Sequence, residues 1–328
     1  MSAIHQSAPL DLSPTINTRL LKLELDSSEV TPSSAISVRL HVTSLVDAPP
    51  YTAVSYVWGE PSPTKQILLD GEAFTIRENL WNLLNRLRSE RHQGYLWIDA
   101  LSIDQTNNLE KNHQVAIMGS IYRQARTTIA WLGSATMDVA EGWKILESQS
   151  SHMSISLEAL HDNPGWRFIW ANPYWTRIWI LQEYLLSADV EFWCSSGTMK
   201  ANVLRWHMYQ YYLPPGGTAA WNIMKLGSNS FNLENRSMMG LLRAAYGCQC
   251  VDAHDRIYAL LSLLPPDERE AWSISPDYSK SMQALFEELV SAYPKSLRTL
   301  PLGDWKQELR RLVLREGMWS EEYLQSLV

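Results

Sequence analysis

Three short apolar runs that alternate with helical patterns constrain the fold of this chain more than any other feature of its sequence. The runs cover residues 51–59, 95–99 and 127–132, and each is followed by turn or acidic residues. Residues 78–88 and 109–124 lie between them and repeat apolar side chains at helical spacing. This order of strand, helix, strand, helix, strand predicts a parallel sheet with right-handed crossovers and flanking helices.

Further elements are predicted on both sides of this unit. The runs 19–25 and 36–42 alternate apolar and polar side chains, as strands do, and 65–69 and 72–76 flank Asp70-Gly71, a pair that favours a tight hairpin turn. Later patterns predict a partly helical insertion over 136–170, a strand over 190–194, a loop over 211–217, and helices over 201–212, 237–246, 255–264 and 281–293.

The expected fold class is therefore α/β, with an open, mainly parallel sheet, a β-hairpin insertion and a mostly helical C-terminal region. We divide the 328 residues into a flexible leader (1–17), an α/β core (18–195) and a helical extension packed on that core (196–328).

Composition excludes several classes of partner. A net charge of −7 argues against a nucleic-acid backbone as ligand. Three cysteines are too few for a secreted disulfide framework, which favours a reducing compartment. The sequence has no signal-peptide pattern and no apolar stretch near the roughly 18 residues that span a bilayer. We expect a cytoplasmic protein with neither a nucleic-acid nor a membrane partner.

Residues 175–187 hold an acid, Glu183, inside a segment apolar enough to be a buried helix. On an ideal helix Trp179, Gln182 and Glu183 share one stripe, whereas Arg177 lies about 240° away from Glu183 and is not expected to be its direct partner. A buried glutamate is either tied into a structural network or used in chemistry, and the sequence leaves both interpretations open. Burial would raise the pKa of such a carboxyl, and a nearby cation would lower it.

Ligands of open α/β sheets bind beyond the carboxyl ends of the parallel strands, so the polar residues there are the candidates for binding. Two acids at one pocket can share acid and base work, which makes Glu183 and Asp99 the candidate catalytic residues. The structural alternatives are that Asp99 or Asp104 caps the following helix and that the tryptophans are core side chains. The candidate substrate-binding residues are Ser55, Tyr56, Trp58, Gly59, Trp97, Asp104, Gln105, Trp179 and Gln182.

Common cofactor and metal motifs are absent from the sequence. We find no Walker loop, no Gly-x-Gly-x-x-Gly and no Gly-x-Ser-x-Gly. Cys248-Gln-Cys250 with Asp252 and His254 matches no usual metal-ligand spacing. We therefore predict no metal site and no resident cofactor.

Three ordered motifs carry a family resemblance. They are Ala53-Val-Ser-Tyr-Val-Trp-Gly, Leu96-Trp-Ile-Asp-Ala-Leu-Ser-Ile-Asp-Gln and Trp175-Thr-Arg-Ile-Trp-Ile-Leu-Gln-Glu. Together they resemble the fungal heterokaryon-incompatibility (HET) domain, with similarity covering roughly residues 18 to 280. Ser102 stands where that family usually has cysteine, which excludes thiol chemistry there, and Ser262 stands where glycine is common.

The resemblance implies a function. HET domains are implicated in fungal non-self recognition and regulated cell death, and are regarded as distant relatives of Toll/interleukin-receptor (TIR) domains. The segment from Trp179 to Glu183 is similar to the Trp-Cys-x-x-Glu segment whose Glu is catalytic in the TIR domains that hydrolyse NAD. By this resemblance the core is TIR-like, Glu183 faces the nicotinamide-bearing ribose, Tyr56, Trp58 or Trp97 lies near the rings, and NAD is a substrate rather than a cofactor.

Two other functions fit the same residues. One is a non-catalytic module that signals by self-association, which would make the protein a homo-oligomer. The other is a stand-alone enzyme of fungal small-molecule metabolism that uses the same cleft on a different ligand.

Overall fold

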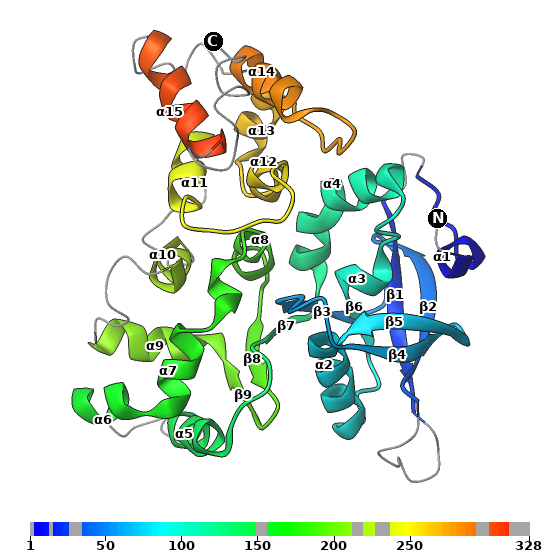
Figure 1. Ribbon diagram of the computed structural model, residues 1–328, viewed down its shortest axis with the longest axis vertical. Helices are drawn as coiled ribbons and strands as arrows, with labels where there is room; N and C mark the ends of the chain where they lie inside the picture. The colour runs from blue at the N-terminus through cyan, green and yellow to red at the C-terminus, as the bar shows by residue number, and fades with distance from the viewer. Residues whose placement is uncertain are drawn as a thin grey trace.

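One nine-stranded sheet runs through the first 200 residues of the computed structural model, in the order β5-β4-β2-β1-β6-β3-β7-β8-β9 (Figure 1). The structure describes residues 3–12, 16–25, 35–148, 156–211, 219–226, 237–292 and 302–314. The strands are β1 (Asn17–Glu24), β2 (Ser37–Ser44), β3 (Tyr51–Tyr56), β4 (Thr64–Leu69), β5 (Glu72–Arg77), β6 (Tyr95–Trp97), β7 (Thr127–Trp131), β8 (Val190–Cys194) and β9 (Gly197–Lys200).

The centre of the sheet is parallel and its flanks are mostly antiparallel. Strands β6, β3, β7 and β8 run parallel to one another, as predicted. Strand β1 is antiparallel to both β2 and β6, and the pairs β4–β5 and β8–β9 are antiparallel hairpins. The prediction of a mainly parallel sheet is thus right for the centre and wrong for the flanks. The β4–β5 hairpin turns at Asp70-Gly71, both with positive φ, and joins the same sheet through β2.

Helices on both faces bury the central strands. Alternate residues of β3 point to opposite faces, so Val54 and Tyr56 pack with the leucines of α2 (Glu78–Ser89). Tyr51 and Ala53 pack on the other face with α4 (Asn108–Gln124). Ser55 has the same parity as Tyr51 and Ala53 and faces the same side.

The order of the parallel strands reverses at β3. The chain passes from β3 to β6 on one side, and then through α3 (Asp99–Ser102) and α4 to β7 on the other side. Flavodoxin-like sheets have the same reversal and bind their ligand beyond the carboxyl ends of the strands at that point. The carboxyl end of β3 is therefore where the fold favours a ligand site.

The segment that carries Glu183 is not one continuous helix, so the prediction of a helix over 175–187 was wrong. A 3-10 turn, η1 (Pro173–Thr176), comes first, and Arg177 then has an extended backbone, with φ −77° and ψ 134°. Helix α8 (Ile180–Leu185) follows as a separate element. The interruption is stabilised from outside, because Arg177 forms a parallel β-bridge with Gln249.

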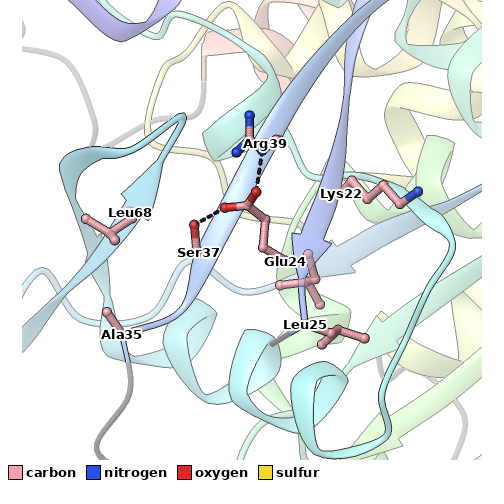
Figure 2. Close-up of a pocket in the computed structure, with 8 residues that line it drawn as sticks. Lys22, Glu24, Leu25, Ala35, Ser37, Arg39 and Leu68 are labelled. Carbon is pink, nitrogen blue, oxygen red and sulfur yellow. Dashed lines mark hydrogen bonds and ion pairs between the residues drawn. The ribbon is translucent and has the colours of Figure 1, made fainter. Parts of the chain in front are cut away.

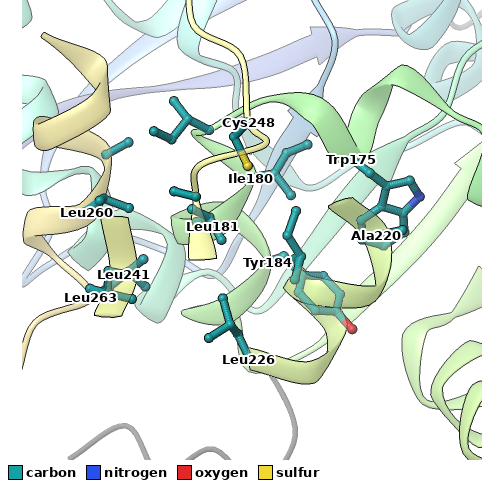
Figure 3. Close-up of a cluster of buried hydrophobic side chains, with 14 of the residues drawn as sticks. Trp175, Ile180, Leu181, Tyr184, Ala220, Leu226, Leu241, Cys248, Leu260 and Leu263 are labelled. Carbon is teal, nitrogen blue, oxygen red and sulfur yellow. The ribbon is translucent and has the colours of Figure 1, made fainter. Parts of the chain in front are cut away.

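The later helices surround α8 on the side away from the sheet. Figure 3 shows Leu181 and Tyr184 of α8 within a buried apolar cluster that also contains Leu241, Leu260 and Leu263. The remaining helices are α5 (Met137–Ser148), α6 (Leu157–Asp162), α7 (Pro164–Trp170), α9 (Ala201–Tyr211), α10 (Ala219–Leu226), α11 (Met238–Ala244), α12 (Asp255–Leu261), α13 (Pro266–Trp272), α14 (Met282–Ala292) and α15 (Leu302–Leu314). The predicted loop over 211–217 lies, apart from its first residue, outside the described residues.

A buried ion pair ties the start of the chain to the segment after β6. Arg19 of β1 binds both carboxylate oxygens of Glu110, at 2.5 and 3.0 Å, and also donates to the carbonyl oxygen of Ser102 at 3.1 Å. The sequence did not indicate the short helix α1 (Ala3–Ser7), whose buried His5 contacts the carbonyl oxygen of Leu101 at 2.9 Å.

Across the described residues, no helix combines the length and the apolar character needed to cross a bilayer.

Candidate functional site

The carboxylate of Glu183 lies beside the last residues of β3. Ser55 donates a hydrogen bond to Glu183 Oε2, and Nη1 of Arg177 lies 3.7 Å from the same oxygen. The hydroxyl of Tyr174 is 2.9 Å from Ser55 Oγ, so hydroxyl groups extend from η1 through β3 to the acid. Glu183 itself is 2% exposed. A buried acid with a hydroxyl donor and a cation as neighbours is the central feature of this site.

Burial and charge set the protonation of Glu183. Burial raises the pKa of its carboxyl to about 7, while Arg177 and the Ser55 hydroxyl act in the opposite direction and the negative charge of Asp99 adds to the rise. Near neutral pH the carboxyl therefore populates both its protonated and its ionised form. A group with this pKa can accept or donate a proton at physiological pH.

Arg177 is the partner that the ideal-helix argument had excluded. That argument was wrong because Arg177 has an extended backbone between η1 and α8 instead of a helical one, which brings the guanidinium to the carboxylate. The guanidinium also donates to the backbone oxygen of Tyr56. Burial lowers the pKa of Arg177, but the charges of Glu183 and Asp99 outweigh it and hold that pKa above its ordinary value. The side chain of Arg177 is 18% exposed and that of Glu183 3%, so a ligand approaching from solvent meets the guanidinium first.

Asp99 forms the second carboxylate of the site, at the first residue of α3. Its carboxylate accepts hydrogen bonds from Trp58 Nε1 at 2.8 Å and from the backbone N–H of Ala100 at 2.7 Å. Burial raises the pKa of Asp99, and Arg177 and these donors oppose the rise. Gln105 donates to the Asp99 backbone oxygen at 3.1 Å. Asp99 is partly exposed, so it borders the site on the solvent side.

Trp58 and Gly59 continue β3 at the edge of the site. The indole of Trp58 is partly exposed, and the guanidinium of Arg77 lies 5.5 Å from its ring centroid. Arg77 also donates to the backbone oxygen of Gly59, at 2.6 Å. Gly59 has φ +77°, which favours glycine, and a Cβ there would meet Asn79 at 3.2 Å.

Several predicted binding residues have structural roles instead. Trp97 is fully buried and donates to Thr18. The side chain of Tyr56 is buried against α2, but its hydroxyl hydrogen-bonds Asp99, so this residue adjoins the second carboxylate. Asp104 does not cap α4, because Asn107 accepts the first backbone N–H groups of that helix. Asp104 instead forms a turn by accepting the backbone N–H of Thr106 at 3.1 Å and its hydroxyl at 2.6 Å.

The carboxamide of Gln182 points away from Glu183. Its Nε2 donates to the backbone oxygen of Tyr258 in α12, at 3.2 Å, and its buried Oε1 has no hydrogen-bond partner among the described residues. Trp179 is partly exposed and packs against the apolar residues of α4. These two side chains connect α8 to its neighbours rather than to the carboxylate.

Sequence reasoning missed Tyr174 and Tyr122 as neighbours of the acid. Burial holds the pKa of both phenols well above the ordinary value, and the charge of Glu183 adds to this. Tyr122 donates to the backbone oxygen of Val54, at 2.9 Å, and so anchors β3 from α4. Tyr174 lies in an aromatic-rich stretch and Tyr122 on the apolar face of the helix predicted over 109–124, so no local signal distinguishes either residue.

A second polar cluster lies away from this site. A pocket at the end of β1 is lined by Lys22, Glu24, Ser37 and Arg39 (Figure 2), and Glu24 accepts from both Ser37 and Arg39. Because β1 is antiparallel to β6, this pocket lies at the opposite edge of the sheet. Within the part of the chain that the structure describes, no group of His, Cys, Asp and Glu could hold a metal ion.

Comparisons with known proteins find a family and two relatives that this chain resembles. The family described as Heterokaryon incompatibility protein (HET) matches residues 51–183, a range that contains Ser55, Asp99, Arg177 and Glu183. Heterokaryon incompatibility protein 6, OR allele, of Neurospora crassa is 25% identical over an alignment of 386 positions, and the match covers 93% of this chain and 55% of that protein. Vegetative incompatibility protein HET-E-1 of Podospora anserina is 24% identical over 150 residues, 44% of this chain and 10% of that protein.

These matches confirm the HET resemblance that the three motifs predicted. The chain spans about half the length of the Neurospora relative. No solved structure matches it significantly.

Proposed function

We propose that the site around Glu183 cleaves the N-glycosidic bond of a nucleotide such as NAD, within a HET-domain protein of fungal non-self recognition. The observation that carries this proposal is the buried carboxylate of Glu183, whose pKa of about 7 suits proton transfer and charge stabilisation at neutral pH. Its position beside the last residues of β3, at the strand where the order reverses, supports ligand binding there.

The reaction needs an anionic group beside the anomeric carbon. The bond from that carbon to the pyridinium nitrogen breaks, and its electron pair leaves with neutral nicotinamide. The ribose becomes oxocarbenium-like, and the ionised carboxylate of Glu183 stabilises its positive charge. A water oxygen then bonds to the anomeric carbon, and its proton passes to a carboxylate, Glu183 or Asp99, to give ADP-ribose.

The surrounding residues supply complementary roles. The partly exposed indole of Trp58 offers a flat surface for a ring, and its hydrogen bond to Asp99 fixes the orientation of that surface. The guanidinium of Arg177 provides a positive charge for the ligand's phosphates. A TIR-like core, with Glu183 in the position of the TIR glutamate, is part of the same proposal.

Nicotinamide release from NAD by the purified chain tests the proposal. We expect release by the wild type and a loss of at least about 100-fold in Glu183→Gln, which keeps the shape of the side chain but cannot ionise. Glu158→Gln, a change of an exposed carboxylate on α6, is the matched control and should release nicotinamide at the wild-type rate. Absence of release at high protein concentration would refute the proposal.

A non-catalytic self-associating module is the second candidate. It is favoured by the contacts of Glu183, because Ser55 and Arg177 both approach Oε2 of the carboxylate from within the fold, and structural networks also bury acids in this way. Light scattering separates the two candidates. A module assembles as concentration rises and keeps assembling in Glu183→Ala, whereas an enzyme of this kind loses activity in that variant.

A further inference from the structure

Two segments that are far apart in sequence pair beside the candidate site. Residues 248–250 lie between α11 and α12, outside the 51–183 range of the family match, and run parallel to residues 176–178. The backbone N–H of Gln249 donates to the carbonyl oxygen of Thr176 at 2.5 Å, and that of Ile178 donates to the carbonyl oxygen of Gln249 at 3.0 Å. These two bonds enclose Arg177.

Packing fixes the C-terminal partner of this bridge. The side chain of Cys248 is buried in the apolar cluster around α8, near Ile180 (Figure 3). Gln182 of α8 binds the backbone of α12 through the carbonyl oxygen of Tyr258. The side chain of Gln249, in contrast, is exposed, so its backbone makes the contact with the 176–178 segment.

We propose that Gln249 is a positioning residue of the candidate site, because its backbone bridge holds Arg177 in the extended conformation that places the guanidinium against the Glu183 carboxylate. The helical C-terminal region then determines whether the positive charge of Arg177 lies next to the Glu183 carboxylate. The α/β core alone does not complete the site. The catalytic meaning of this arrangement rests on the proposed function, but the positioning itself does not.

If the guanidinium of Arg177 moved away from Glu183, the pKa of Glu183 would rise. The guanidinium lowers the pKa of that carboxyl, and the Ser55 hydroxyl does so as well. Burial and the charge of Asp99 act upward, and the phenols of Tyr174 and Tyr122 stay neutral because their own pKa values are strongly raised. Without Arg177 the pKa of Glu183 therefore rises above about 7, and the carboxyl is protonated at neutral pH.

Gln249→Pro breaks the bridge at one atom, because proline has no N–H to donate to Thr176. Gln249→Ala is the matched control, since it changes only the exposed side chain. The readout is the titration of Glu183 in the full chain labelled with ¹³C at glutamate carboxyls, assigned by the signal that is lost in Glu183→Gln. We expect Gln249→Pro to raise the pKa towards that of Arg177→Met, and Gln249→Ala to titrate as the wild type.

A double variant separates positioning from general damage. In the Arg177→Met background, Gln249→Pro should add no further shift, because the charge that the bridge positions is already gone. A folded Gln249→Pro that titrates as the wild type, or an equal shift in both backgrounds, would overturn the proposal.

If Gln249→Pro does not fold, one glycine inserted after Gly247 displaces the bridge more gently, since a Cβ at Gly247 would meet nothing within 4 Å. A folded insertion variant with the wild-type titration overturns the proposal equally. Because the carboxyl signal is observed directly, failure to cleave NAD would refute the proposed function and leave this result intact.

Discussion

Glu183→Gln should make the stability of this protein less dependent on pH. The pKa of Glu183 is about 7 in the folded chain against an ordinary value of 4.5, so folding disfavours the ionised form. A difference of one pKa unit corresponds to about 1.36 kcal/mol. The difference between 4.5 and about 7 therefore means that ionisation of Glu183 destabilises the folded chain by about 3 kcal/mol. Solvent screens little of this, because the side chain is only 3% exposed.

The direction in which stability changes with pH follows from proton binding. Between pH 4.5 and about 7 the folded chain holds a proton at Glu183 that the unfolded chain has lost, so the wild type loses stability as pH rises through this window. The stabilising contribution is complete below pH 4.5 and is lost above about pH 7. The amide introduced by Glu183→Gln does not titrate, so the variant lacks this loss.

Urea unfolding followed by tryptophan fluorescence measures the difference at several pH values from about 4.5 to about 8. The free energy of unfolding of Glu183→Gln minus that of the wild type should rise by about 3 kcal/mol across the window and then level off. Any effect of the amide that is independent of pH adds the same amount at every pH and so does not contribute to this rise. Glu158→Gln controls for the change in net charge and should follow the wild type. A difference that stays constant with pH would show that Glu183 ionises alike in both states.

Three further substitutions test the surroundings of the site. Arg19→Met leaves a buried carboxylate without its cation and should lower the free energy of unfolding by about 3 to 5 kcal/mol, measured in urea; a loss below about 1 kcal/mol would contradict the buried ion pair. Ser55→Ala removes a hydroxyl that favours the ionised acid, so the pKa of Glu183 should rise above about 7, and an unchanged carboxyl titration would argue against this contact. Gly119→Ala would place a Cβ 2.3 Å from Cβ of Ser262 and should cost about 1 to 3 kcal/mol, with part of the loss recovered when Ser262→Gly is added; equal losses in single and double variants would exclude this clash.

Local patterns predicted the elements whose form depends on neighbouring residues. Leucines at helical spacing predicted α2, and Asp70-Gly71 predicted the β4–β5 hairpin. The interruption before α8 was not predictable in this way. Asn172 caps the turn at Pro173, and Gln249 pairs with Arg177 from a distant part of the sequence. No local periodicity records a contact of that kind.

In the candidate site, too, local patterns predicted some residues and missed those that depend on distant contacts. Strand-end logic placed Ser55 and Asp99, the apolar segment around Glu183 singled out that acid, and the family resemblance gave it a possible role. Arg177 was rejected on ideal-helix geometry, although an arginine inside an apolar segment was itself a signal of a buried partner. The antiparallel pairing of β1 with β2 and β6 and the β8–β9 hairpin were also missed, because strand patterns show which residues are buried but not which strands become neighbours.

The pH dependence of nicotinamide release tests the role of Glu183 most directly. With NAD as substrate between about pH 5 and about pH 9, the rate should rise through one ionisation near pH 7, as the carboxyl of Glu183 becomes anionic, and should be lost in Glu183→Gln. Release by Glu183→Gln at the wild-type rate, or no release by the wild type at any pH in that range, would contradict the assignment of Glu183 as the catalytic carboxylate.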